Sequence, residues 1–256
     1  MKLERLYQRE GLHGCGIPEA LRALYGGDLG FDGPRVIGNF VASVDGVVAL
    51  PVAAESGGVI SQGNDADHFV MGLLRACAAS VLVGAGTFRK GDGLWDAESI
   101  FPAQAEAFRA LRRQLGLPPR PLFAVVTDSG DLDLAHPALQ EALIATTPRG
   151  AAHLGKLPPG ARLMVSPDGG LAQVMAALRA LGVVLCEGGP TLIGQLIGGG
   201  LLDELFLTRA PSVFGRRRGD DRKSLVEGVE LGARPLELAS LHRNSSYLFL
   251  RYFLPR

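Results

Sequence analysis

The chain is poor in the residues that build disulfide frameworks and metal sites. Its 256 residues include three cysteines, five histidines and one tryptophan. Cys15, Cys77 and Cys186 are odd in number and lack the spacing of metal ligands, which indicates reduced thiols in a cytoplasmic protein. We therefore expect no disulfide framework and no bound metal.

A net charge and a long apolar run are missing as well. Lys plus Arg and Asp plus Glu number 26 each, so no overall field attracts a nucleic acid or an anionic membrane. The longest uncharged apolar run, Gly188–Leu202, is too short and too rich in glycine to span a bilayer, and the N-terminus has no signal-peptide core. The expected partner is a small molecule, with no nucleic acid and no membrane.

Aromatic residues are also scarce, so the core must be built from other side chains. They make up 6% of the chain against 47% for all hydrophobic residues, which leaves Leu, Val and Ala to fill the interior. Residues 1–34 are rich in glycine and predict an N-terminal arm, either draped over the domain or facing a partner. Residues 35–256 are expected to fold as one domain.

Strand-like and helix-like segments alternate along this domain. Short apolar runs predict strands at 36–44, 80–83, 122–126, 142–146, 163–165, 183–186 and 202–208. Apolar residues at helical spacing predict helices at 65–78, 101–115, 171–181 and 190–197, and loops are expected at 50–64 and 84–95. This order indicates an α/β fold in three layers, with a mainly parallel sheet flanked by helices. Residues 236–241 and 247–253 predict a C-terminal antiparallel hairpin.

Three loops that leave predicted strands carry unusual residues. They are Ser43–Val48, Gly84–Gly91 and Glu187–Thr191. Ligands of such sheets bind beyond the carboxyl ends of the strands, so we expect the three loops to form one shared site. The charged segment 211–223 is either a solvated loop or a phosphate clamp.

The last of these loops, Glu187-Gly188-Gly189-Pro190-Thr191-Leu192, combines features that suit a phosphate. Its glycines allow close approach of a ligand, Pro190 fits the first turn of a helix, and a helix start offers free N–H groups. A tight turn without a ligand is the alternative from this segment alone.

A second glycine segment, Val83-Gly84-Ala85-Gly86-Thr87, resembles the start of a dinucleotide fingerprint. It fails that pattern because Arg89 stands at the third glycine position. Gly84 and Gly86 still bring the backbone close to a phosphate, and Thr87 offers a hydroxyl. The sequence contains no nucleophile elbow and no zinc motif, which favours chemistry carried by a cofactor, with hydride transfer as the natural candidate.

Three motifs together resemble one known family. They are Ser43-Val44-Asp45-Gly46, then Leu74-Arg75-Ala76 leading to Val83–Thr87, and Glu187–Leu192 followed by Leu202-Asp203-Glu204-Leu205. Their order and spacing over residues 35–254 are similar to the RibD C-terminal family, the pyrimidine reductase domain of riboflavin biosynthesis. The likeness is greatest to stand-alone actinobacterial versions.

The resemblance implies a dihydrofolate reductase-like fold and a defined reaction. In this family NADPH reduces a phosphoribosylamino pyrimidine, with hydride delivered to C1 of the opened ribose. The resemblance also implies a cis peptide between Gly188 and Gly189. A lysine common in the first strand is missing, with Phe40 in its place, and the aspartate after the Thr87 loop is displaced to Asp92 or absent. Asp128 and Asp131 stand where close relatives carry arginine, so NADH is not excluded as the cofactor.

The candidate site residues follow from the motifs and the resemblance. The catalytic candidates are Glu187, Asn39 and Asp45, and the substrate-binding candidates are Arg75, Ser43, Ser61 and Asp67. The cofactor-binding candidates are Ala42, Val83, Gly84, Gly86, Thr87, Thr127, Ser129, Gly188, Gly189, Pro190, Thr191 and Leu192. Alternatively, Arg75 pairs with Asp65 or Asp67 on a helix surface, Asp45 caps its turn, and Asn39 satisfies backbone groups.

The predicted function is an NADPH-dependent pyrimidine reductase of riboflavin biosynthesis, or a paralogue acting on a related heterocycle. A dihydrofolate reductase-like pterin reductase and a non-catalytic nucleotide-binding protein are the alternatives. We expect a homodimer, since symmetric dimers are the commonest oligomers. The segment Gly188–Leu202 and the strand Leu205–Leu207 are the faces expected to meet the second copy.

Overall fold

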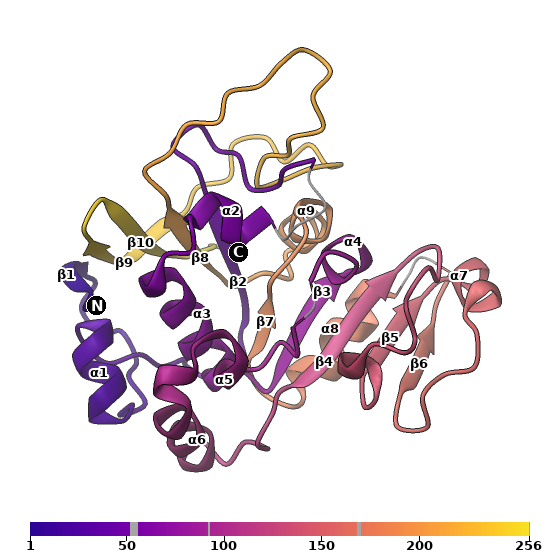
Figure 1. The fold of residues 1–256 in the computed structure, drawn as a ribbon, viewed down its shortest axis with the longest axis horizontal. Helices are drawn as coiled ribbons and strands as arrows, with labels where there is room; N and C mark the ends of the chain where they lie inside the picture. The colour runs from indigo at the N-terminus through magenta and orange to yellow at the C-terminus, as the bar shows by residue number, and fades with distance from the viewer. Residues whose placement is uncertain (52–55, 92, 168–169, 256) are drawn as a thin grey trace.

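The computed structural model describes residues 1–51, 56–91, 93–167 and 170–255. These residues form one ten-stranded sheet in the order β1-β9-β10-β8-β2-β7-β3-β4-β5-β6 (Figure 1). The strands are β1 (Glu4–Gln8), β2 (Val36–Ala42), β3 (Ser80–Gly84), β4 (Leu122–Thr127), β5 (Leu143–Thr146), β6 (Arg162–Val165), β7 (Val184–Cys186), β8 (Glu204–Arg209), β9 (Glu237–Asn244) and β10 (Tyr247–Phe253).

The sheet is parallel from β8 to β6 and antiparallel at its other end. β2 pairs in parallel with β8 and β7, and β3 pairs in parallel with β7 and β4. β10 pairs antiparallel with β8 and β9, and the two hairpin strands are joined at Ser245 and Ser246. The predicted mainly parallel sheet with a C-terminal antiparallel hairpin is therefore confirmed.

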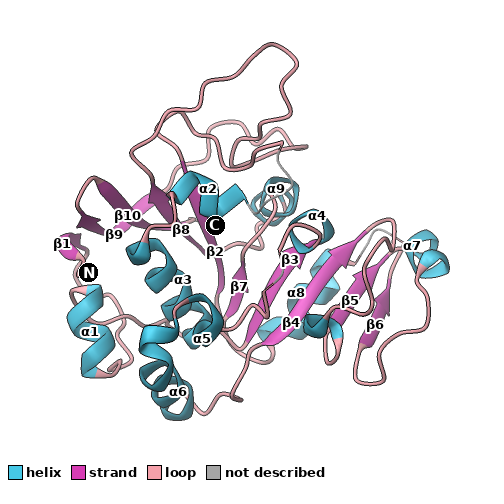
Figure 2. Ribbon diagram, in the orientation of Figure 1, coloured by secondary structure: helices cyan, strands magenta, loops and turns pink. Residues whose placement is uncertain are grey.

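The helices lie between the strands in the chain, as the alternating pattern predicts (Figure 2). They are α1 (Glu19–Tyr25), α2 (Ser56–Ser61), α3 (Asp65–Cys77), α4 (Ala85–Phe88), α5 (Ala97–Ile100), α6 (Ala105–Gln114), α7 (Pro148–His153), α8 (Leu171–Arg179) and α9 (Pro190–Gly198), with 3-10 turns η1 (Pro102–Gln104) and η2 (Pro137–Leu139). The helix predicted from residue 101 begins with the 3-10 turn η1, where Pro102 stands in the first turn, and α6 follows it.

Two segments expected to be loops contain short helices. α2 lies within the predicted loop 50–64, although two of its six residues are glycine. Burial of Ile60 against the core stabilises this turn, so tertiary packing overrides weak helix propensity. α4 lies within the predicted loop 84–95, where a single helical turn follows Gly84.

Strand residues alternate between two cores, one on each face of the sheet. Val81 and Val83 of β3 pack in the cluster that contains α3 and α6 residues. Leu82, between them, packs with α8 and α9 residues on the other face. This period of two confirms the three-layer arrangement of helices, sheet and helices.

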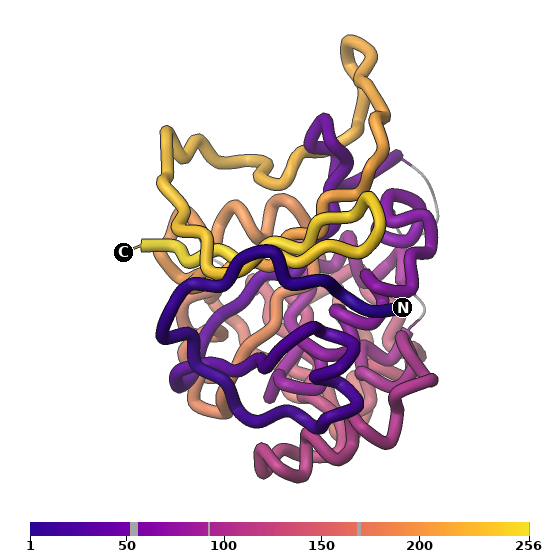
Figure 3. The backbone as a smooth tube through the Cα atoms, turned by 90° about the vertical axis from the view of Figure 1, so that its left-hand side faces the viewer, coloured from indigo at the N-terminus to yellow at the C-terminus, as the bar shows by residue number. Residues whose placement is uncertain are grey.

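The N-terminal segment contributes a strand to the same sheet. β1 pairs antiparallel with β9, and Figure 3 shows this segment alongside the C-terminal hairpin. Leu3, Ile17, Leu21 and Leu29 are almost completely buried. The sequence did not predict β1, since its side chains are mostly exposed and have no apolar alternation.

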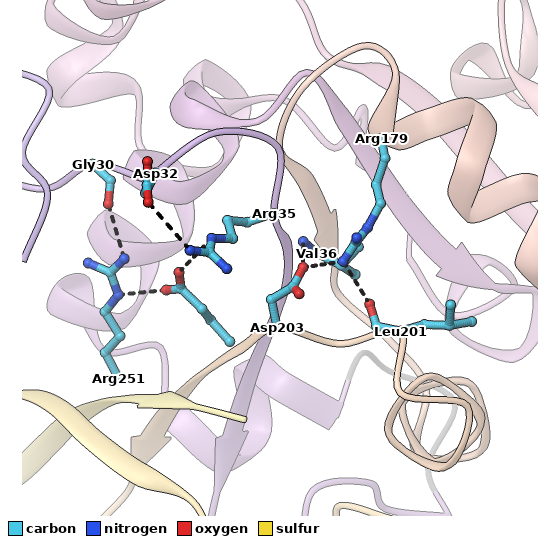
Figure 4. A network of polar contacts seen from close by, with 9 residues as sticks. Gly30, Asp32, Arg35, Val36, Arg179, Leu201, Asp203 and Arg251 are labelled. Carbon is cyan, nitrogen blue, oxygen red and sulfur yellow. Dashed lines mark hydrogen bonds and ion pairs between the residues drawn. The ribbon is translucent and has the colours of Figure 1, made fainter. Parts of the chain in front are cut away.

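A buried charge network holds the amino ends of the central strands (Figure 4). Arg251 lies 2.7 Å from Glu204 and also donates to the carbonyl of Gly30. Asp203 pairs with Arg179 and accepts a hydrogen bond from the backbone N–H of Val36. The network therefore ties the amino ends of β2 and β8 to the carboxyl end of the antiparallel strand β10.

The faces expected to meet a second copy are largely covered within the chain. Leu192, Ile193, Leu196 and Ile197 of α9 are buried. Segment 225–231 packs over that helix, and the strand residues Leu205 and Phe206 lie in the middle of the sheet. The protein's own long loop therefore covers part of the helix surface, and the expected dimer face stays a prediction. In the described part of the chain, no helix has the length and apolar character needed to cross a membrane.

Candidate functional site

A cleft of about 700 Å³ lies at the carboxyl edge of the parallel strands. Its volume falls within the range of roughly 300–1,000 Å³ typical of small-molecule sites. Loops after β2, β3, β4 and β7 contribute to it, so the three loops singled out in the sequence do converge. The lining includes the candidates Asn39, Asp67, Gly84, Gly86, Thr87, Thr127, Ser129, Glu187, Gly188, Gly189, Pro190, Thr191 and Leu192.

Two glycine loops meet in the middle of the cleft. The backbone N–H of Gly84 donates to the carbonyl of Gly188 at 3.0 Å, which joins the end of β3 to the end of β7. The Gly188–Gly189 peptide is cis, as the resemblance implied. A Cβ atom on Gly188 would lie 2.4 Å from Thr87 Oγ1, so only glycine allows this approach.

Helix α9 begins at the edge of this glycine contact. Gly189 precedes it as the N-cap and has no side chain to cap the first backbone N–H groups, while Pro190 is the first helical residue. Thr191 and Leu192 of the first turn line the cleft. The unsatisfied donors and the helix dipole make this a position that suits an anionic phosphate.

Glu187 is held by a buried ion pair with Arg75. Arg75 donates through Nη2 to Glu187 Oε2 at 2.7 Å and through Nε to both carboxylate oxygens at 3.0 Å. The two side chains are 7% and 5% exposed, and Arg75 Nη1 donates to the carbonyl of Asp96. The alternative partners Asp65 and Asp67 are therefore wrong for Arg75, and its guanidinium faces Glu187 instead of the cleft.

Arg112 supports this pair from behind, and the sequence patterns did not identify it. Arg112 is 3% exposed, and its guanidinium donates to the carbonyls of Arg75 and Ala78 at the end of α3 and to that of Pro118 after α6. Burial lowers the pKa of Arg112 to about 10. Its place one position after the buried Leu111 of α6 was the only available signal in the sequence.

Asp67 is a buried carboxyl group in the wall of the cleft. The residue is 5% exposed, and this burial raises the pKa of Asp67, while hydrogen bonds from the hydroxyl groups of Thr208 and Ser61 act in the opposite direction. Ser61 itself is fully buried, and its carbonyl accepts a hydrogen bond from the Tyr247 hydroxyl. Ser61 thus supports Asp67 and is not part of the lining.

Asp45 anchors a loop, as the turn-capping alternative proposed. It accepts hydrogen bonds from the Ser43 hydroxyl at 2.5 Å and from the backbone N–H of Gly215 at 2.7 Å. The Ser43 hydrogen bond is the main reason that the pKa of Asp45 falls to about 2.

Six of the predicted site residues do not line the cleft. They are Ala42, Ser43, Asp45, Ser61, Arg75 and Val83.

The charged segment 211–223 is tied to the mouth of the cleft. Lys223 exchanges backbone hydrogen bonds with Ala49 and also accepts one from the N–H of Val48. Asp221 and Lys223 line the cleft, and Lys90 Nζ donates to the nearby carbonyl of Leu50. The sequence patterns singled out both segments but named neither lysine as a candidate site residue.

The far end of the cleft lies beyond β4. Thr127, Asp128 and Ser129 line it, and Arg89 pairs with Asp131 next to them. This end of the cleft thus holds the carboxylates of Asp128 and Asp131 together with the cation of Arg89. Asp92, the displaced position considered for the family aspartate, lies outside the described residues.

A helix-covered parallel sheet with a glycine-walled cleft at its carboxyl edge defines an α/β protein of the dihydrofolate reductase-like class. The chain belongs to the RibD C-terminal domain family, whose model matches residues 34–247. The resemblance inferred from the three motifs is therefore confirmed. A comparison with curated proteins finds no significant match.

Solved structures show the same fold at low sequence identity. A pyrimidine reductase-like protein from Corynebacterium diphtheriae is 20% identical, with a TM-score of 0.66 over 87% of this chain and 92% of that one. Acinetobacter baumannii RibD is 20% identical, with a TM-score of 0.63 over 87% of this chain and 58% of that one. The riboflavin biosynthesis reductase Rib7 of Saccharomyces cerevisiae is 13% identical, with a TM-score of 0.56 and coverage of 90% and 94%.

Proposed function

We propose that the protein is a cytoplasmic NADPH-dependent reductase of a phosphoribosylamino pyrimidine, or a paralogue acting on a related heterocycle. The contact between the loops of Gly84 and Gly188 carries this proposal. It presents backbone amides and the start of α9 to the cleft with no intervening side chain. Such a surface suits the pyrophosphate of a dinucleotide, and membership of the RibD C-terminal domain family supports a reductase.

The residues of the cleft fit a nicotinamide dinucleotide laid across the strand ends. Gly84, Gly86 and Thr87 from one loop and Gly189–Leu192 from the other would hold the phosphates. When bound, the nicotinamide supplies a hydride. Asn39, Asp67 and Glu187 lie on the β2 and β7 side of the phosphates and would meet the substrate there. The adenosine would then extend toward Thr127 and Ser129 on the β4 side.

NADPH is proposed as the cofactor over NADH on the family resemblance. Arg89 is the cation available at the adenosine end, and its ion pair with Asp131 is exposed, so it is free to turn toward a 2′-phosphate. Asp128 acts against this choice through charge repulsion. Comparison of the dissociation constants of the protein for NADPH and for NADH decides between the two cofactors.

Trp95 provides a direct test of binding because it is the single tryptophan. It is 3% exposed and stacks near Phe88 under the Gly84–Gly91 loop. We expect NADPH to quench its fluorescence saturably, and NADH to do so at higher concentration. The ribosylamino pyrimidine phosphate should then cause loss of absorbance at roughly 340 nm, the reduced-nicotinamide band.

Two results would contradict the proposal. Saturable cofactor binding without oxidation by any pyrimidine substrate would favour a non-catalytic nucleotide-binding protein. Oxidation with dihydrofolate but not with the pyrimidine would favour a pterin reductase.

We also propose a homodimer. Light scattering of the purified protein tests this, and a monomer at micromolar concentration would refute it.

A further inference from the structure

Opening the ribose of the proposed substrate requires a proton at the ring oxygen. The C1–O4 bond breaks, the lone pair of the exocyclic nitrogen forms a C1=N bond, and O4 becomes a hydroxyl group. Hydride addition at C1 then completes the reduction. The protein must therefore place one acid beside the sugar, a role that Glu187 fits poorly because an arginine occupies both of its oxygens.

The cleft offers few other groups for this step. Among the described residues that line it, the carboxyl groups besides Glu187 are Asp67, Asp128 and Asp221. Asp128 lies at the adenosine end and Asp221 lies on the exposed mouth loop. Asp67 alone is both buried and on the side of the cleft assigned to the substrate. No histidine belongs to the described lining.

We infer that Asp67 is the catalytic acid that protonates the ribose ring oxygen, an inference that rests on the proposed function. Asp67 starts as the neutral carboxylic acid and gives its proton to O4 as the C1–O4 bond breaks. After hydride has reached C1, water at the cleft mouth returns a proton to the carboxylate. The balance is one reduced cofactor and one proton consumed for each ribityl product and oxidised cofactor formed.

The surroundings of Asp67 make both protonation states accessible. Burial and the nearby Glu187 charge disfavour its anion. Thr208 from β8 and Ser61 from α2 donate hydrogen bonds that favour the anion, as does the charge of His68 on the same helix. Tyr247 from β10 also faces Asp67. A group held between opposing influences can release and recover a proton.

The first test is Asp67→Asn, with Asp65→Asn as the matched control. Asp65 lies in the same first turn of α3 but is exposed and does not line the cleft. Loss of a general acid typically lowers kcat by about 100-fold or more. We expect that loss for Asp67→Asn, with an unchanged dissociation constant for NADPH measured through Trp95, and wild-type values for Asp65→Asn.

The second test is Thr208→Val, which removes one donor to the Asp67 anion. The acid is active when protonated, so kcat should fall as pH rises through the pKa of Asp67. Removing a donor that lowers this pKa should move that alkaline limb to higher pH. A purely structural role for Asp67 would leave the limb where it is.

The outcomes separate the inference from the function on which it rests. If the wild-type protein does not oxidise NADPH with the pyrimidine substrate, the function is wrong and the inference falls with it. If the wild type turns over and Asp67→Asn keeps its kcat, or Thr208→Val leaves the alkaline limb unmoved, the inference alone is overturned. Should Asp67→Asn fail to fold, the Thr208→Val pH profile still decides.

Discussion

At the scale of single residues, Gly188 controls how closely two loops of the cleft approach. Its backbone φ of +152° and the nearby Thr87 side chain both exclude a Cβ atom. We expect Gly188→Ala to push the loops apart and to weaken NADPH binding by about tenfold or more, since it breaks a contact that shapes the phosphate site. Titration of Trp95 fluorescence measures the change. Gly58→Ala is the control, because nothing lies within 4 Å of its Cβ position; equal binding by both variants would contradict the prediction.

The Arg75–Glu187 pair gives a second prediction at this scale. Arg75→Met leaves the Glu187 carboxylate buried without its cation, which typically costs about 3–5 kcal/mol of unfolding free energy. The double variant Arg75→Met with Glu187→Leu removes both charges and should recover part of that loss. Urea denaturation measures all variants, and a double variant less stable than Arg75→Met would refute this account.

At the scale of elements, His242 joins β9 to α1. Its ring lies 4.5 Å from that of Tyr25, and burial lowers the pKa of His242 to about 4. The unfolded chain, with a histidine pKa near 6.5, therefore binds more protons between pH 6.5 and 4. The stabilisation by neutral His242 is complete above pH 6.5 and is lost as the pH falls through this window.

This difference predicts a loss of about 2 kcal/mol of unfolding free energy between pH 7.5 and 5 from His242 alone. His242→Phe keeps a ring beside Tyr25 and removes the titrating group, so its stability should depend less on pH. Urea denaturation at the two pH values compares the proteins. Identical pH dependence in the wild type and the variant would show that His242 does not titrate as described.

Elements also show which parts of the fold the sequence could predict. Short continuous apolar runs predicted the parallel strands, because such a strand is buried on both faces of the sheet. The helix α2 escaped prediction because its glycines disfavour a helix, while burial of residues such as Ile60 stabilises it. The strand β1 escaped because hydrogen bonding to β9, and no local pattern, holds it in the sheet.

At the scale of the whole molecule, residues 1–34 complete the sheet and the core beneath it. Deleting them would expose the edge of β9 and remove the buried side chains of Leu3, Ile17, Leu21 and Leu29. Arg251 would also lose the carbonyl of Gly30. We expect the shortened chain to aggregate or to unfold at a clearly lower temperature. A monodisperse product with an unchanged thermal midpoint would contradict this.

The amino-acid sequence by itself determined the layered α/β architecture, the family and the three loops of the cleft, because periodicity and glycine motifs are local in the chain. Only the tertiary structure decided the partners of the polar side chains. Arg75 and Glu187 are 112 positions apart and Asp45 and Gly215 are 170 apart. No local pattern records such distant contacts, so whether an aspartate anchors a loop or faces a ligand depends on how the whole chain packs.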